Sequence, residues 1–232
     1  RALRKAEARG VTEQDFDPGV KAFDPETAPA SFVSQLREVS DDWLRGRPGG
    51  ERGFCMGRFD LRRLSDVWLS VAWTRASQRV EAFATWVPVP APRGWALDLM
   101  RRGRHATAGV MELLVVRSLE EARARDDALL SLSLSALAMV QDAGLVAGEA
   151  DDAPQNKARE FLMDHLARYY DFRGLFRWKR KFDPCFEDRY LVCRSPLDLP
   201  QVAWALFRAQ TPGGLLSFVR PRGTAMAIRE SA

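Results

Sequence analysis

The first clear apolar periodicity along the chain lies in residues 31–46. Apolar side chains recur there every three or four positions, and Gly46 follows as a stop signal. Four residues share the apolar side: Phe32, Leu36, Val39 and Trp43. The pattern predicts an amphipathic helix over 31–46, preceded in residues 1–30 by the end of another helix and a connector.

Aromatic and β-branched runs follow, and they predict strands. Residues 67–74 and 80–89 are rich in Val, Trp and Phe, with the turn-like sequence RASQR between them. Two such runs around a short polar turn are typical of an antiparallel hairpin. Residues 94–100 predict a third strand.

The rest of the chain alternates between helical and strand-like patterns. Residues 106–127 predict a long helix, whose inward side is formed by Met111, Leu114, Val115, Ser118 and Leu119. We expect a buried strand over 128–139, a helix over 156–172, a strand over 190–195 and a helix over 198–210. This order predicts an α+β fold with a mixed, mainly antiparallel sheet flanked by helices. Acyltransferases of the GNAT type share the order, and so do several unrelated folds.

Composition supports a folded domain and argues against several classes of site. With 232 residues and 46% hydrophobic content, the chain can bury a sizeable core. Its 35 basic and 31 acidic residues give a net charge of +4, which indicates an anionic partner only if the charge is clustered. Three cysteines and two histidines without ligand-like spacing argue against a zinc site and a disulfide framework. We therefore expect no metal and no cofactor.

The apolar runs, the first residues and the cysteines of the sequence indicate where in the cell the protein is expected. No run reaches the roughly 18 apolar residues that cross a membrane, and no signal peptide opens the chain. The cysteine usage fits a reduced, intracellular compartment. Because the first residues read as a helix already in progress, we expect the chain to begin inside a longer protein.

One group of candidate functional residues is DLMRRGRH, residues 98–105, between a predicted strand and a predicted helix. A loop at a helix N-terminus suits anions, Asp98 suits an ammonium group, and the arginines suit phosphate or a developing oxyanion. The arginines are Arg101, Arg102 and Arg104. A charged turn that caps a helix explains the same residues. The pyrophosphate-binding glycine spacing of CoA-dependent acetyltransferases is absent, which argues against acetyl-CoA.

A second group is WKRKFDPCFEDRY, residues 178–190, where basic, acidic and aromatic side chains alternate closely. If the segment is extended, Lys179 and Lys181 lie on one face and Arg180 and Phe182 on the other. Basic groups between aromatic rings suit a nucleotide or a single-stranded 3′ end. An ion-pair network over aromatic packing is the alternative, and the sequence favours neither.

No motif for covalent catalysis accompanies these groups. The chain has no nucleophile elbow, no phosphate-binding loop and no Cys–His pairing. His165 is expected to pack in the core, and His105 has no carboxylate partner nearby in sequence. If the protein is an enzyme, positioning and electrostatics would carry the reaction.

Several stretches together resemble the C-terminal domain of the phosphatidylglycerol lysyltransferases, or aminoacyl-phosphatidylglycerol synthases. They are spread over nearly the whole chain: RALRKAEARGV, DDWLRGR with ERGFCMGRFD, ALDLMRRG with TAGVMELLVV, SLSALAM, and LFRWKRKFDPCFEDRYLV with PLDLPQVA. DLMRR and KFDPCFEDRYL, found in this order, are the most specific. Where the family reads SLNFA this chain reads SLSAL, with Ser135 in the Asn position.

The resemblance implies a tRNA-dependent aminoacyltransferase of GNAT-like fold. It would move an amino acid, lysine in the first instance and alanine as the alternative, from aminoacyl-tRNA to phosphatidylglycerol. This lowers the negative charge of the membrane and contributes to antimicrobial peptide resistance. Residues 1–30 would lead out of a preceding GNAT-like half, and residues 31–232 would form the C-terminal GNAT-like domain. Such a domain is expected in the cytoplasm, at the inner face of the cell membrane, with an N-terminal membrane or GNAT-like part in the same protein.

The resemblance also implies roles for particular residues. Asp98 and Arg101 are the predicted catalytic residues, with Asp98 meeting the α-amino group and Arg101 stabilising the tetrahedral oxyanion. Predicted substrate-binding residues are Arg58, Arg102, Ser135, Lys179, Lys181, Asp183, Glu187, Arg189 and Tyr190. Among them, Lys179, Lys181 and Arg189 would hold anions and Glu187 would help to hold the amine.

Two alternative functions remain open from the sequence. One is an acyl-CoA-dependent GNAT N-acyltransferase that acts on a small amine. The other is a non-catalytic domain that binds lipid or tRNA.

Overall fold

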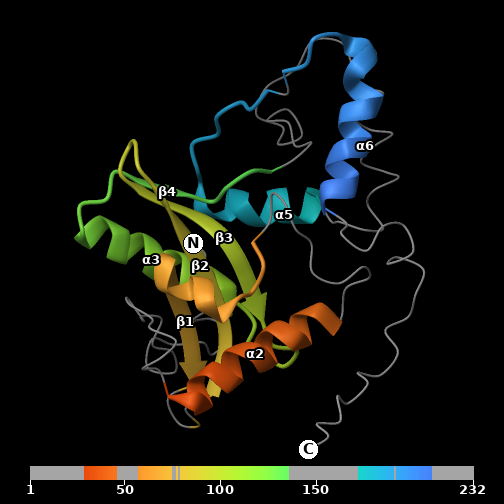
Figure 1. Ribbon diagram of the computed structural model, residues 1–232. Coiled ribbons are helices and arrows are strands. Elements are labelled where there is room, and N and C mark those ends of the chain that lie inside the picture. Colours follow the sequence, from red (N-terminus) through yellow and green to blue (C-terminus); the bar gives the residue numbers. More distant parts are fainter. Residues whose placement is uncertain are drawn as a thin grey trace, which may run out of the picture.

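The computed structural model describes residues 29–45, 57–74, 77, 79–135, 172–190 and 192–210 (Figure 1). Its centre is a four-stranded sheet in the order β1-β2-β3-β4. The strands are β1 (Trp68–Thr74), β2 (Arg79–Val89), β3 (Gly94–Arg102) and β4 (Leu129–Ser131). The first three pair antiparallel and β4 runs parallel to β3, so the predicted α+β class with a mixed, mainly antiparallel sheet is confirmed.

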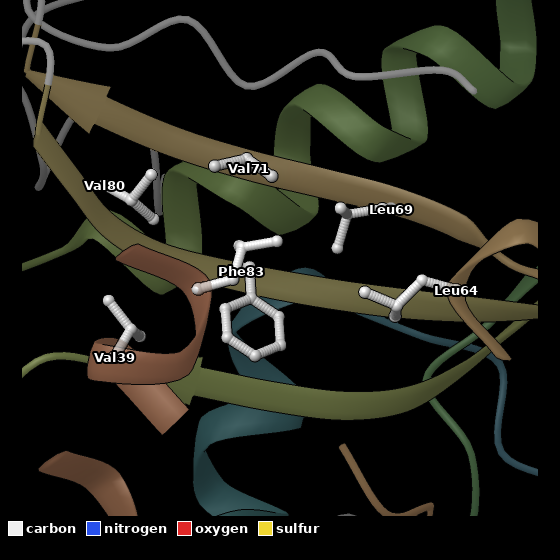
Figure 2. Close-up of a cluster of buried hydrophobic side chains, with 7 residues drawn as sticks. Val39, Leu64, Leu69, Val71, Val80 and Phe83 are labelled. Atoms are coloured by element: carbon white, nitrogen blue, oxygen red, sulfur yellow. The ribbon is translucent and has the colours of Figure 1, made fainter. Parts of the chain in front are cut away.

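One face of the sheet is covered by α2 (Ala30–Arg45), which matches the helix predicted from the apolar spacing. Successive residues of a strand point to opposite faces, and Leu69 and Val71 of β1 point toward this helix. They join Phe83 of β2, Val39 of α2 and Leu64 of the 3₁₀ helix η1 (Leu61–Asp66) in one buried cluster (Figure 2).

The opposite face is covered by α3 (Val110–Ala124), the helix predicted over 106–127. Trp68 and Ala72, the alternate residues of β1, pack on this side. Ser70 also points this way, and its hydroxyl lies 2.8 Å from that of Ser118 while accepting a hydrogen bond from the indole of Trp86. Four residues of the predicted inward side are buried, but Leu119 is 51% exposed, which corrects its placement.

Two strand predictions were wrong. The run over 128–139 forms only the three-residue β4 before an irregular segment that is described as far as Ser135. None of the described residues of 190–195 is in a strand. Both runs are apolar, but only the first three residues of β3 pair with β4, and Val192 is exposed and lies outside the described strands.

The start of the charged tract over 178–190 is helical, so the extended arrangement considered for it does not apply. It lies at the end of α5 (Phe172–Lys179) and in the 3₁₀ turn η3 (Arg180–Phe182) that follows. The turn η4 (Pro196–Asp198) leads into α6 (Leu199–Gln210), which matches the predicted helix and stands beside the sheet rather than on it (Figure 1). The helix predicted over 156–172 and the connector over 1–28 lie outside the described residues, as does His165.

Candidate functional site

Asp98 owes its position to an irregularity in the sheet. Thr85 of β2 pairs with Leu99 of β3, while the next residue, Trp86, pairs with Leu97, so Asp98 is left without an opposite residue. Such a bulge redirects one side chain relative to strict alternation. The carboxylate of Asp98 therefore lies on the α2 face with Thr85, although alternation from Met100 would place it on the α3 face.

Two neighbours surround this carboxylate. The hydroxyl of Thr85 lies 3.4 Å from Oδ2 of Asp98, within reach of a long hydrogen bond. Gly57, from the segment before η1, approaches so closely that a Cβ built on it would overlap both carboxylate oxygens. Arg58 follows Gly57 in the chain and is exposed. Gly57 thus brings a segment that is distant in sequence against Asp98, and the substrate-binding role of Arg58 stays a prediction.

Arg101 is on the same face of β3 but is nearly enclosed. Its residue is 2% exposed, with Nη1 placed 3.4 Å from the hydroxyl of Ser40. The guanidinium lies over the ring of Trp43, 4.3 Å from the ring centre. The helix α2 thus provides a cation–π partner and a hydroxyl, and both hold the guanidinium of Arg101 on the α2 face of the sheet.

The loop after β3 resembles an anion site, but the carboxylate of Glu81, from the neighbouring strand β2, already binds to it. Glu81 falls at the second sheet irregularity, where Ala72 pairs with Ala82 and Trp73 with Val80. Its Oε2 accepts a hydrogen bond of 2.7 Å from the backbone N–H of Thr107, just before α3. Its Oε1 accepts a bond of equal length from the Thr74 hydroxyl. Glu81 thus links the loop to β2, whereas α3 begins after Gly109 without a side-chain cap. Arg102, Arg104 and His105 are exposed.

Lys179 ends α5 and is buried, with 4% of the residue exposed. Its Nζ donates hydrogen bonds to the backbone carbonyls of Ser133 and Leu134, at 3.1 and 2.9 Å. Burial lowers the pKa of Lys179 to about 8. The adjacent Ser135 has its hydroxyl buried without a hydrogen-bond partner. Lys179 therefore binds the irregular segment Ser133–Ser135 after β4, and this segment carries the other predicted residue, Ser135.

The start of the charged tract mixes aromatic packing with ion pairing. Trp178 and Phe182 meet edge to face at 5.0 Å and pack against the core on the α3 side. Lys181 forms an ion pair of 2.7 Å with Glu112 of α3. Burial on its own would raise the pKa of Glu112, but hydrogen bonds from Lys181, the backbone and Trp178, with the positive charge of Lys181, together lower it. Asp183 follows with a left-handed backbone, φ 53°. This part of the tract matches the structural alternative.

The end of the tract projects into solvent. Glu187 and Arg189 pair with each other at 2.8 Å, with side chains 70% and 65% exposed. Tyr190 is 81% exposed, and its hydroxyl donates to Asp188, which raises the pKa of Tyr190. No hydrogen bond or ion pair joins Glu187 or Arg189 to Asp98 or Arg101 within the described segments. These contacts do not test the predicted convergence of the two pairs in one cleft, which stays a prediction together with their roles.

Several neighbours of the site were missed in the sequence. Thr85, Gly57, Ser40 and Trp43 all contact Asp98 or Arg101. Trp43 was recognised only as part of an apolar helix face, and Gly57 only as part of a motif. No short stretch of sequence marks these residues, because each contacts Asp98 or Arg101 only once the chain has folded.

The described part of the chain holds no group of three His, Cys, Asp or Glu residues arranged for a metal ion. Within the same ranges, every helix is too short or too polar to cross a bilayer.

The chain folds as an α+β domain, with a mixed sheet between two helices. A family model described as "Phosphatidylglycerol lysyltransferase, C-terminal" matches residues 16–193. This match covers well over half of the chain, so the chain belongs to the family of phosphatidylglycerol lysyltransferase C-terminal domains. The resemblance seen in the residues is thereby confirmed.

Known relatives agree with this assignment. The phosphatidylglycerol lysyltransferase of Bacillus subtilis is 27% identical over 196 residues, covering 83% of this chain and 22% of that protein. An uncharacterized protein of Corynebacterium glutamicum is 28% identical over 180 residues, 76% of this chain and 22% of that protein. The chain thus spans about a fifth of the length of these relatives.

Solved structures support the fold. One is the C-terminal domain of a protein described as a lysylphosphatidylglycerol synthetase from Agrobacterium fabrum. It has a TM-score of 0.68 and 23% identity, covering 92% of this chain and 60% of that one. The structure of L-PGS from Bacillus licheniformis has a TM-score of 0.64 and 22% identity, covering 89% of this chain and 57% of that one.

Proposed function

We propose that this chain is the catalytic domain of an aminoacyltransferase that moves an amino acid from aminoacyl-tRNA to phosphatidylglycerol. Membership of the phosphatidylglycerol lysyltransferase family supports the lipid acceptor and the transferase class. The observation that carries the assignment of a site is the bulge in β3, which directs Asp98 to the α2 face beside Thr85 and Gly57. We also infer a GNAT-like arrangement for the domain, in agreement with the mixed sheet and its two covering helices.

The proposed reaction is an ester exchange. A hydroxyl of the glycerol headgroup attacks the ester carbonyl carbon of the aminoacyl-tRNA, and a tetrahedral intermediate forms. Its collapse breaks the bond to the terminal ribose oxygen, which receives the proton lost by the glycerol hydroxyl. No covalent enzyme intermediate is needed for this exchange, so alignment and stabilisation of the oxyanion would lower the barrier.

Asp98 and Arg101 have complementary proposed roles. A partly exposed carboxylate fixed by neighbours is suited to hold the α-ammonium group of the aminoacyl end. Arg101 lies three residues further along the same strand and contributes a fixed positive charge behind the site. In a region of low dielectric such a charge favours a developing oxyanion.

Lysine is the proposed amino acid, with alanine as the alternative. The family name supports lysine, while Ser135 in place of the family's Asn borders the segment that Lys179 holds. The remaining site roles, those of Arg102, Lys181, Asp183, Glu187, Arg189 and Tyr190 in binding, stay part of this proposal. Membrane association of the full-length protein at the cytoplasmic face follows from the acceptor lipid.

The test is a transfer assay with the full-length protein. A panel of labelled aminoacyl-tRNAs is incubated with phosphatidylglycerol vesicles, and the lipids are separated by chromatography. We expect one aminoacyl-phosphatidylglycerol product that depends on a charged tRNA. Absence of any labelled lipid, together with heat released on titration with acyl-CoA, would replace the proposal with the acyl-CoA alternative. Binding of vesicles or tRNA without product would favour a non-catalytic domain.

A further inference from the structure

The carboxylate of Asp98 is held by two residues to which no role has been assigned so far. Thr85 is 1% exposed and belongs to the neighbouring strand β2. Gly57 comes from a separate segment, and a Cβ on it would lie 2.5 Å from Cγ of Asp98. Both contacts join parts of the chain that are far apart in sequence.

Thr85 interacts with both sides of the bulge. Its hydroxyl accepts a hydrogen bond of 3.0 Å from the backbone N–H of Leu99. The same hydroxyl can donate its one proton to Oδ2 of Asp98, 3.4 Å away. A bulge leaves part of the strand ladder unpaired, and here a side chain supplies the missing acceptor. Thr85 therefore couples the backbone irregularity to the direction of the carboxylate.

Gly57 limits the position of Asp98 from the other side. Contacts under about 3 Å to a Cβ do not occur in folded proteins, so any other residue here would displace the carboxylate or the segment. Gly57 does not have a positive φ, so its backbone conformation does not itself require glycine. The requirement for glycine arises from the close approach of Asp98.

We propose that Thr85 and Gly57 are positioning residues that fix the Asp98 carboxylate for the transfer reaction. Thr85 orients the carboxylate through its hydroxyl, and Gly57 leaves the space that the carboxylate occupies. This inference rests on the proposed function, because it assigns both residues to the site in which Asp98 holds the substrate. A misplacement of about 1 Å at a reacting centre is enough to lower a rate by one to two orders of magnitude.

The experiment compares variants of the full-length protein in the lipid transfer assay, with lysyl-tRNA as the donor. We expect Thr85→Val to lower kcat/KM by at least about tenfold and Thr85→Ser to restore it to within about threefold. Inhibition by uncharged lysine tRNA should be unchanged in both variants, because the carboxylate meets only the aminoacyl end. General damage to the fold would weaken this inhibition as well.

A matched control removes another buried hydroxyl from the same sheet. Ser70 is 0% exposed, bonds to Trp86 on the α3 face, and has no part in the site. We expect Ser70→Ala to lower Tm but leave kcat/KM within about twofold of wild type. An equal loss of activity in Ser70→Ala and Thr85→Val would overturn the proposal, since any buried hydroxyl would then matter alike.

Gly57 is tested by a double-mutant cycle with Asp98. Gly57→Ala alone should lower kcat/KM at least about tenfold, but in an Asp98→Ala background it should have no further effect. The reason is that Asp98→Ala removes the atoms with which the new methyl group collides. Equal effects of Gly57→Ala in both backgrounds would overturn the proposal.

The outcomes separate this inference from the proposed function. If Asp98→Ala keeps wild-type transfer, the proposed site itself is wrong and the inference fails with it. If Asp98→Ala loses transfer while Thr85→Val and Gly57→Ala keep it, only the positioning roles are wrong.

Discussion

The sheet and the segment after α5 treat their charged residues differently. In the sheet, Asp98, Arg101 and Glu81 are held by side chains or backbone groups from distant parts of the chain. In residues 187–198, charged groups pair with neighbours a few positions away, as Glu187 does with Arg189 and Arg194 with Asp198. The contacts in the sheet fix the positions of its charged groups, whereas the charged side chains of residues 187–198 stay largely in water.

Preorganisation is the property that separates the two regions. A carboxylate fixed by a bulge, a hydroxyl and a close glycine needs no reordering when substrate binds. Exposed side chains lose rotamer freedom on binding, and water screens their charges. We therefore expect the sheet to carry most of the stability and the catalytic effect, and the exposed segment to contribute less to both.

The largest expected difference is in stability, and leucines at both places test it. Leu69 of β1 is 0% exposed and Leu197 of η4 is 86% exposed. Leu69→Ala should lower the free energy of unfolding by about 2–5 kcal/mol, while Leu197→Ala should change it by less than about 0.5 kcal/mol. Urea denaturation followed by circular dichroism measures both. Similar losses would show that the exposed segment packs against something in solution.

The second difference is in transfer activity. Asp98→Asn keeps the size of the side chain and removes its charge, and we expect it to lower kcat/KM by about 100-fold. Glu187→Gln makes the same change in a side chain that is 70% exposed, and we expect a loss of no more than about threefold. Initial rates of lipid aminoacylation measure both. Equal losses would show that the segment closes on the substrate and would break the comparison.

The third prediction concerns pH and Lys179. The folded-state pKa of Lys179 is about 8, below the 10.5 of an exposed lysine, because the amine is buried. Between these values the unfolded chain binds a proton that the folded protein does not, so the free energy of unfolding should rise with pH. The rise is limited to about 1.4 kcal/mol per pH unit, the effect of one proton. Urea melts from pH 7 to 10 should show a flatter profile for Lys179→Met than for wild type; identical profiles would contradict this.

The smallest expected effect is on the salt dependence of tRNA binding. Arg102 is exposed, so Arg102→Ala should reduce the slope of log K against log salt concentration by about 1. Lys181 was also predicted to hold phosphate, but its ammonium already pairs with Glu112 at 2.7 Å. Lys181→Ala should therefore reduce the slope less. Filter binding over a range of salt concentrations measures both slopes. A larger reduction in Lys181→Ala than in Arg102→Ala would contradict the prediction.

Local patterns predicted most of the described elements. The helix α2, the hairpin β1–β2, strand β3, the helix α3 and α6 all appear where periodicity and turn residues indicated. For the mixed tract over 178–190 the sequence left an extended arrangement and aromatic packing open, and its first part, residues 178–182, is helical with aromatic residues turned inward. Composition alone cannot separate these cases, since packing against the sheet decides between them.

The sequence determined the two faces of the sheet and the family to which the chain belongs. Alternation in β1 sends Leu69 and Val71 to one side and Trp68 and Ala72 to the other, a property of the extended backbone that holds in any context. The sequence also supplied the pair Asp98 and Arg101 three residues apart. Only the tertiary structure decided on which face Asp98 lies, because a bulge shifts alternation by one residue and arises from pairing between strands. Thr85 and Gly57 meet Asp98 for the same reason: their contacts depend on strand register and loop approach, which no short window of sequence contains.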